Sequence, residues 1–337
     1  MGDGERQGEN RRGESRTSTI PPMIAKSVAM QRFHDHLKRF ALRNRPVVLE
    51  GERGTGKTTF AGLLHTYSPR AGGPFVHVNL ASLSEGVMLT ELFGHVKGAY
   101  TSAIGSRPGL LRAAAGGTIL LDEIGKAPRE VQCALLPVLD RRTMRQVGSD
   151  REEPIDVRLV FACNEDLDEL VRSKVMLADF KDRLGLFRAR APSLRERKED
   201  LPDLAQQLLE RAAAADARYK GIPPQMTAGM LRRLAAYDWP GNVRELESLC
   251  ERLIVDAAGS SLLDESLLAE ELAIYAEQRV AARQNGGMPT VAEVHAAIAD
   301  CGGNVSKAAL KLGIGRTSLY RILGAKHETP EEERPSA

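Results

Sequence analysis

The stretch VVLEGERGTGKT, residues 47–58, decides the fold of this 337-residue chain. A short apolar run of the kind that forms a buried strand leads into the pattern GxxxxGK(S/T), and Phe60, Leu63 and Leu64 follow at helical spacing. Glycines let backbone N–H groups turn inward around phosphate oxygens, and the helix that follows points its positive N-terminal end at them. A glycine-rich turn can match these letters by chance, but a strand before and a helix after them predict a phosphate-binding loop.

Residue types within the loop predict individual roles. We expect Lys57 to reach the β- and γ-phosphates of ATP, and the Thr58 hydroxyl to ligate Mg²⁺. The loop residues that we expect to bind the nucleotide are Gly51, Glu52, Arg53, Gly54, Thr55, Gly56, Lys57, Thr58 and Thr59.

Outward from the loop, the pattern favours an α/β sheet. Apolar runs at residues 46–50, 75–79, 117–122 and 157–164 are separated by stretches of helical periodicity, such as Phe33, Leu37, Phe40 and Ala41. Runs this apolar are typical of central parallel strands that are covered on both faces by helices. Residues 201–272 are predicted to be mostly helical, as is a compact unit that starts at residue 290.

Composition excludes several classes of protein. Hydrophobic residues make up 42% and charged residues 27% of the chain, which argues against disordered, collagen-like and membrane-spanning proteins. The net charge of +2, from 47 basic and 45 acidic residues, means that any nucleic-acid site must be a local basic patch. The four cysteines lie far apart without a CxxC pair, which fits a reducing compartment, and we expect a cytoplasmic protein with no membrane contact.

Polar side chains end two of the predicted strands. Asp122 is placed to hold the magnesium ion, and Glu123 to orient and deprotonate a water molecule. Asn164 ends another run, where it could touch the γ-phosphate or the water, because ligands bind beyond the carboxyl ends of parallel strands. A solvated turn explains each of these residues equally well in isolation. We interpret the neighbouring Cys163 as a buried, inert thiol.

With these elements in order, the chain resembles AAA+ ATPases, and among them the bacterial enhancer-binding activators of sigma-54 RNA polymerase. Three segments of the motor carry the likeness: ELFGHVKGAYTSA at 91–103, LRERKED at 194–200 and WPGNVREL at 239–246. The segment GNVSKAALKLGIGRTSLY at 303–320 resembles the Fis-type helix-turn-helix of that family. The likeness extends from about residue 24 to 323.

The resemblance implies a fold and a domain order. We expect a three-layer AAA+ parallel sheet with a helical lid, followed by a small all-α helix-turn-helix domain. The expected boundaries are a flexible arm at 1–20, the α/β subdomain at 21–195, the lid at 196–275, a linker at 276–289, the helix-turn-helix at 290–326 and an acidic tail at 327–337. Twenty residues ahead of the motor leave no room for a receiver, PAS or GAF domain, so we expect a separate protein, expression level or a ligand of the motor to control it.

The family also implies roles for single residues. Asn79 matches the residue that restrains the catalytic glutamate, Arg244 matches the lid arginine that senses nucleotide, and Arg183 matches the finger given to the neighbouring subunit's γ-phosphate. Nucleotide then sits between subunits of a ring, usually a hexamer, here assembled from dimers. The segment that would engage sigma-54 holoenzyme consists of Gly98, Ala99, Tyr100, Thr101, Ser102 and Ala103.

The sequence departs from the family at positions between hydrolysis and remodelling. Tyr100 keeps the aromatic body of the family's phenylalanine, whereas Ser102 replaces a glycine and loses conformational freedom. Leu177 stands where a second finger arginine is common, and Arg112 stands where a glutamate is usual. These changes leave the phosphate loop intact.

The C-terminal unit has evidence of its own for DNA binding. Residues 304–327 hold five lysines and arginines and no acidic residue, and Gly313 can form the turn between two helices. The second helix would lie in the major groove with Arg316, Thr317, Ser318 and Arg321 toward the DNA. A basic helical hairpin that only caps the fold is the alternative. Tethered copies in a dimer or ring would strengthen such a small site.

These observations predict an ATP-dependent transcriptional activator that hydrolyses ATP in a ring and remodels promoter-bound sigma-54 polymerase. An alternative is a DNA-binding regulator or repressor in which ATP mainly drives assembly, which Ser102, Leu177 and Arg112 favour. A remodelling ATPase unrelated to transcription is a third class, which DNA binding would exclude.

Overall fold

A computed structural model describes residues 23–99, 105–185, 187–219, 222–269, 271–272 and 290–301, together with residues 308, 312, 319, 322 and 323. The predicted arm, linker and acidic tail lie outside these residues. So do Arg316, Thr317, Ser318 and Arg321 of the predicted DNA-binding helix, and Tyr100, Thr101, Ser102 and Ala103 of the predicted sigma-factor segment.

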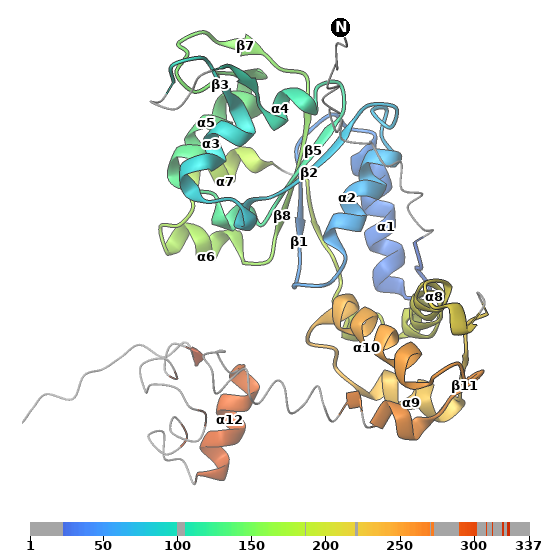
Figure 1. Ribbon diagram of the computed structural model, residues 1–337. Coiled ribbons are helices and arrows are strands. Elements are labelled where there is room, and N and C mark those ends of the chain that lie inside the picture. The colour runs from blue at the N-terminus through green and yellow to red at the C-terminus, as the bar shows by residue number, and fades with distance from the viewer. Residues whose placement is uncertain are drawn as a thin grey trace, which may run out of the picture.

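A five-stranded parallel sheet forms the centre of the larger part, in the order β2-β5-β8-β1-β9 (Figure 1). The four predicted apolar runs are its strands β1 (Val47–Glu50), β2 (Phe75–Asn79), β5 (Thr118–Asp122) and β8 (Arg158–Cys163). The edge strand β9 (Arg188–Arg190) was not predicted, because its two arginines are exposed and only Ala189 is buried.

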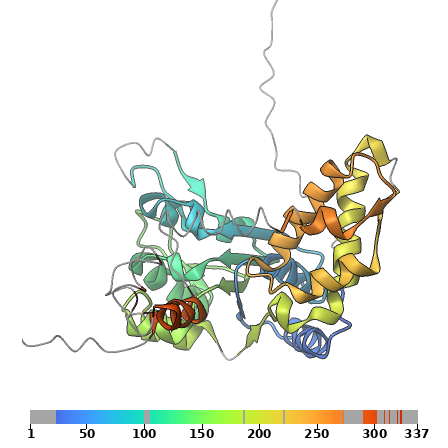
Figure 2. The ribbon, with the colours of Figure 1, turned by 90° about the horizontal axis from the view of Figure 1, so that it is seen from below.

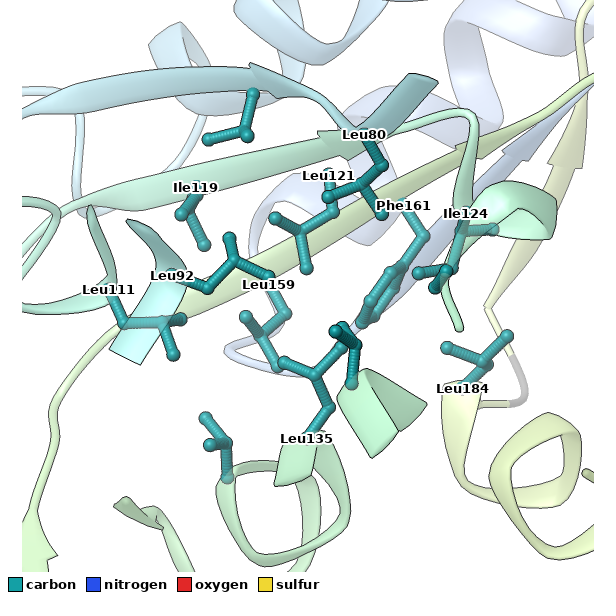
Figure 3. Close-up of a cluster of buried hydrophobic side chains, with 14 of the residues drawn as sticks. Leu80, Leu92, Leu111, Ile119, Leu121, Ile124, Leu135, Leu159, Phe161 and Leu184 are labelled. Atoms are coloured by element: carbon teal, nitrogen blue, oxygen red, sulfur yellow. The ribbon is translucent and has the colours of Figure 1, made fainter. Parts of the chain in front are cut away.

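Helices cover both faces of this sheet (Figure 1). α1 (Val28–Ala41) and α2 (Lys57–Thr66) lie on one face, and α3 (Glu85–Phe93), α5 (Arg129–Arg141), α6 (Leu167–Arg172) and α7 (Ala178–Leu184) lie on the other. Successive strand residues serve different faces, since Leu120 packs with α1 and α2, whereas Ile119 and Leu121 pack with α3 and α5 (Figure 3). The predicted three-layer architecture is therefore confirmed.

Two short antiparallel hairpins extend this part of the molecule. The first pairs β3 (Gly94–His95) with β4 (Arg107–Pro108), and the predicted sigma-factor segment connects these two strands. The second pairs β6 (Thr143–Met144) with β7 (Glu153–Pro154). Val96 and Gly94 exchange backbone hydrogen bonds with Val147, so the two hairpins are joined. One helical turn, α4 (Leu110–Ala113), returns the chain to β5.

A helical lid follows the sheet and lies to one side of it (Figure 2). It consists of α8 (Leu201–Ala214), α9 (Ala228–Ala236) and α10 (Asn242–Asp256), with the short strands β10 (Gln225–Met226) and β11 (Leu262–Leu263). The buried Trp239 lies within its core and donates its indole N–H to the Leu234 carbonyl at 2.9 Å.

Single helical turns, helical residues at 265–269 and 271–272 in the lid, and one further helix complete the described chain. The turns are η1 (Leu80–Ser82), η2 (Ile124–Lys126), η3 (Leu194–Glu196), η4 (Lys198–Asp200) and η5 (Ala217–Tyr219). α12 (Val291–Asp300) starts with a capping box, and Val294 and Ala297 form a small core with Ala308 and Leu319, as the sequence predicts for a helical unit. None of the helices within the described residues is long and apolar enough to cross a membrane.

A buried carboxylate joins the chain ahead of α1 to the lid. Asp200 is fully buried and accepts hydrogen bonds from the backbone N–H groups of Lys26 and Ser27, at 2.5 and 2.8 Å, and from the Ser27 hydroxyl at 2.7 Å. This carboxylate therefore satisfies three donors, and the two from Ser27 are buried.

We expect Asp200→Ala to lower the free energy of unfolding by about 3 kcal/mol, because the buried donors lose their acceptor. Asp203→Ala is the matched control: it removes an exposed partner of Lys26 in the first turn of α8, three residues after Asp200, and should cost less than about 1 kcal/mol. Denaturant titration of both variants measures the difference. Equal losses would show that the buried carboxylate contributes nothing special.

Candidate nucleotide site

The predicted phosphate loop connects β1 to α2 at the carboxyl edge of the sheet. β1 pairs with β8 on one side and with β9 on the other, so the loop emerges from inside the sheet. Gly54 and Gly56 have φ values of 76° and 101°, which is the left-handed region that a side chain would make strained. Gly56 is also the N-cap of α2, so the N-terminal end of that helix faces the loop.

Lys57 is held inside the loop by three oxygens. Its Nζ donates to the carbonyls of Gly51 and Glu52 at 2.7 and 2.8 Å and to Asn164 Oδ1 at 2.5 Å. Burial lowers the pKa of Lys57, and the nearby charges of Asp122 and Glu123 oppose that shift. Asn164 therefore contacts the lysine directly, a partner that its position at the end of a strand did not predict.

Asp122 and Thr58 lie next to each other, as a shared metal site requires. The Thr58 hydroxyl lies 3.3 Å from Asp122 Oδ2. Burial alone would raise the pKa of Asp122, but hydrogen bonds from His77 and from the Glu123 N–H hold that pKa below its ordinary value. The carboxylate therefore stays ionised, and one carboxylate with one hydroxyl fits Mg²⁺, which takes its other ligands from water and phosphate.

Other metal sites are not evident in the described residues, which contain no group of three or more His, Cys, Asp or Glu side chains able to hold an ion. His77 also reaches the carboxylate, although its place in the sequence did not predict this: its Nε2 lies 3.5 Å from Asp122 Oδ2. His77 lies on β2 two residues before Asn79, and only the pairing of β2 with β5 brings it to the carboxylate.

Glu123 and Asn79 lie at adjacent strand ends. Glu123 has left-handed backbone angles, with φ 56° and ψ 48°, directly after β5. Asn79 is the register partner of Asp122, and its carboxamide accepts from the Ala81 N–H at 3.0 Å. That bond uses the Asn79 oxygen to cap the following turn, whereas a contact with the Glu123 carboxylate would use the Nδ2 donor.

A cavity of about 360 Å³ brings most of the predicted site together. The residues that the sequence predicts for the site and that line this cavity are Arg53, Gly54, Gly56, Lys57, Thr58, Thr59, Asn79, Asp122, Glu123, Asn164 and Arg244. Gly51, Glu52 and Thr55 do not line it. The lid adds Leu208, Arg211, Val243 and Glu247, which sequence reasoning missed because only the packing of α8 and α10 brings them here.

The remaining predicted positions lie away from this cavity. Arg183 forms ion pairs with Asp140, at 2.6 Å, and with Asp179 on α7. Leu177 starts α7, where its N–H donates to Gln132 Oε1 at 2.8 Å. Arg112 forms an ion pair with Glu153 of the second hairpin.

The cysteines confirm the expectation of free thiols. All four of them, Cys133, Cys163, Cys250 and Cys301, are unpaired. Burial raises the pKa of the Cys163 thiol to about 11, so it stays protonated and unreactive at neutral pH, as predicted.

Family models match this chain along most of its length. Residues 23–189 match the Sigma-54 interaction domain, residues 195–285 match the AAA+ ATPase lid domain, and residues 293–323 match the bacterial regulatory proteins of the Fis family. The three matches follow one another in the order that the sequence predicts.

Similar proteins are transcriptional regulators. The chain is 34% identical to the transcriptional regulatory protein GlrR of Escherichia coli (strain K12), over 91% of this chain and 68% of GlrR. It is 38% identical to ZraR of Salmonella typhimurium, over 89% of this chain and 68% of ZraR. The crystal structure of NtrX from Brucella abortus in complex with ATP superimposes with a TM-score of 0.66 at 30% identity, over 90% of this chain and 68% of NtrX. On these matches, the chain belongs to the sigma-54-dependent transcriptional regulators, with an AAA+ nucleotide-binding part and a Fis-type helix-turn-helix.

Proposed function

We propose that this regulator binds ATP with Mg²⁺ in the cavity between loop, strand ends and lid, and hydrolyses it to remodel promoter-bound sigma-54 polymerase. The observation that carries the proposal is the convergence of Lys57, Asp122, Glu123 and Arg244 on that one cavity. We retain the predicted domain limits at residues 195 and 275, and we infer a cytoplasmic protein.

Each side chain has a distinct part in the proposed reaction. Lys57 neutralises the β- and γ-phosphates, and Thr58 with Asp122 holds the magnesium ion, which offsets charge on the phosphate oxygens. Glu123 orients the attacking water and accepts its proton. The apolar Leu208 and Val243 of the lid offer a surface for the base, and Arg244 approaches the phosphates from the same side.

A neighbouring copy completes the site in this proposal. Arg183 lies outside its own cavity, and its guanidinium is exposed enough to reach another subunit once it leaves Asp140 and Asp179. A cation supplied there stabilises the charge of the transition state. We therefore propose a ring, a hexamer built from dimers, in which Arg183 acts on the next subunit's ATP.

The remodelling and DNA-binding steps use other parts of the chain. The segment from Gly98 to Ala103 connects β3 to β4, and we propose that hydrolysis moves it against the sigma factor. Residues 316, 317, 318 and 321 would hold the ring at an upstream DNA site. A regulator in which ATP drives assembly alone stays the second candidate, favoured by Ser102, Leu177 and Arg112.

We expect Lys57→Ala to weaken ATP binding by about 3 kcal/mol, since removing one partner of a buried charged contact costs this much. Calorimetry with ATP and Mg²⁺ measures the change. Lys126→Ala is the matched control, because it removes an ammonium that pairs with Glu165 at 2.9 Å outside the cavity. Equal ATP affinity in the two variants would show that the nucleotide binds at another site.

Glu123→Gln should keep ATP bound and slow its hydrolysis by about 10²- to 10⁴-fold, because glutamine has the same shape but accepts no proton. Steady-state ATPase activity, measured against protein concentration, tests this. Wild-type activity per subunit should rise with concentration if Arg183 of a neighbour is needed. Normal turnover by Glu123→Gln would assign the base to another residue.

Sigma-54-dependent transcription in vitro separates the two candidate functions. We expect the wild type to activate transcription and Ser102→Gly to activate at least as strongly, because glycine widens the backbone freedom of the segment. Ser106→Gly, just beyond the segment, is the control and should change little. If neither wild type nor Ser102→Gly activates while both hydrolyse ATP and bind the promoter, the assembly-only regulator is the better account.

A further inference from the structure

The lid and the turn η3 that precedes it hold four consecutive residues of the phosphate loop. Glu52 accepts hydrogen bonds on its carboxylate from both terminal nitrogens of Arg195, with the Nη1 distance at 2.8 Å, and from Asn242 Nδ2 at 3.1 Å. Asn242 Nδ2 also donates to the Arg53 carbonyl at 3.0 Å. Asn242 of the lid and Arg195 of the turn η3 before it thus hold the first half of the loop from outside the cavity.

Backbone and side-chain donors of the lid hold the second half. The Gly54 carbonyl accepts from the N–H groups of Val243 and Arg244, at 2.9 and 3.3 Å. The Thr55 carbonyl accepts from Arg197 Nη2 at 3.0 Å, and Arg197 is itself buried. The first N–H groups of a helix have no partner within it, so α10 uses two of its own on the loop.

The conformation and burial of Asn242 suit its contact with the phosphate loop. It is fully buried and has φ 55°, a left-handed conformation that asparagine tolerates better than most residues. Its Oδ1 accepts from the Leu194 N–H at 2.8 Å, while its Nδ2 serves Glu52 and Arg53. One amide therefore joins the loop, the turn before α8 and the start of α10.

We propose that Arg195 and Asn242 are positioning residues for the nucleotide: through Glu52 and Arg53 they hold the phosphate loop and the Arg244-bearing end of α10 in one arrangement. We call Glu52, Arg195 and Asn242 the loop–lid latch. The inference rests on the proposed nucleotide site and adds residues that do not line the cavity themselves. The Arg195 contact lowers the pKa of Glu52, so the carboxylate stays charged and the latch stays closed at neutral pH.

The latch acts on binding more than on chemistry. A loop that is already ordered loses less conformational freedom when it closes around phosphates. Asp122 ends β5 and Glu123 follows it. None of the latch contacts touches that strand, so the groups that hold metal and water keep their places. Cutting the latch should therefore raise the KM for ATP and leave kcat nearly unchanged.

The test uses calorimetry with ADP, which is not hydrolysed, together with ATPase kinetics on the full chain. Arg195→Gln should weaken ADP binding about fivefold, near the upper end for a half-exposed ion pair. The KM for ATP should rise about as much, and kcat should stay within about twofold. Arg195→Lys, which keeps the charge but not the two-pronged contact, should recover part of the loss.

Arg233→Gln is the matched control. It removes an Arg–Glu pair of similar exposure within the lid, with Glu265 at 2.6 Å, that does not touch the loop. Asn242→Asp keeps the acceptor for Leu194 but places a carboxylate against Glu52, so it should weaken ADP binding more than Arg195→Gln does. Fluorescence of Trp239, the one tryptophan, reports whether the lid of each variant is folded.

A double variant shows whether the residues act together. If the latch exists, Glu52→Gln combined with Arg195→Gln should bind ADP no more weakly than the weaker single variant. Additive losses, an ADP affinity for Arg195→Gln equal to that of Arg233→Gln, or a fall in kcat at constant KM would each overturn the latch. If the wild type binds no ADP, the proposed nucleotide site is refuted together with the latch. If the wild type and the latch variants bind ADP equally well and only Lys57→Ala does not, the latch alone is refuted.

Discussion

Lys57 carries a positive charge at a position where only 7% of its surface reaches solvent, and the nearby structure is arranged to keep that charge. Two loop carbonyls and Asn164 supply its hydrogen bonds, while Asp122 and Glu123 supply the opposing charge. An ammonium buried without such partners would cost several kcal/mol. The need to satisfy it links β1, β5 and β8, because their carboxyl ends are where those groups converge.

The phosphate loop, which surrounds the charge of Lys57, needs contacts beyond those that the sheet provides. Its glycines remove the side chains that would otherwise anchor it, and their left-handed angles preclude regular pairing with a neighbouring strand. The lid supplies most of the missing contacts, from Arg197, Asn242 and the first N–H groups of α10, and Arg195 in the turn before the lid supplies the rest. Sheet and lid thus share one loop, and the nucleotide site exists only where they meet.

The sequence predicted what local patterns control. The strands β1, β2, β5 and β8, helix α1 and the strand–loop–helix order follow from runs of apolar residues. β1, β5 and β8 are buried along almost their whole length, and α1 is buried along one stripe. The prediction of a central position is wrong for β2, which lies at one edge of the sheet and buries only Val78. β9 was not predicted, because an edge strand with two exposed arginines lacks that apolar pattern. The sequence also did not predict three side chains of the site, Leu208, Arg211 and His77. They reach it through tertiary packing, which no spacing along the chain encodes.

The positions of Arg112 and Leu177 show which part of the fold is affected by these two departures from the family pattern. Arg112 pairs with Glu153, and Leu177 packs at the start of α7, so neither lines the cavity that holds Lys57 and Asp122. Substitutions at these positions leave the charges and hydrogen bonds around the phosphate loop as they are. Arg112 instead links the turn after the first hairpin to the second hairpin, which is the part of the fold that carries the segment from Gly98 onward. Separate contacts therefore hold the two regions, so substitutions at the hairpins can leave the proposed nucleotide site unchanged.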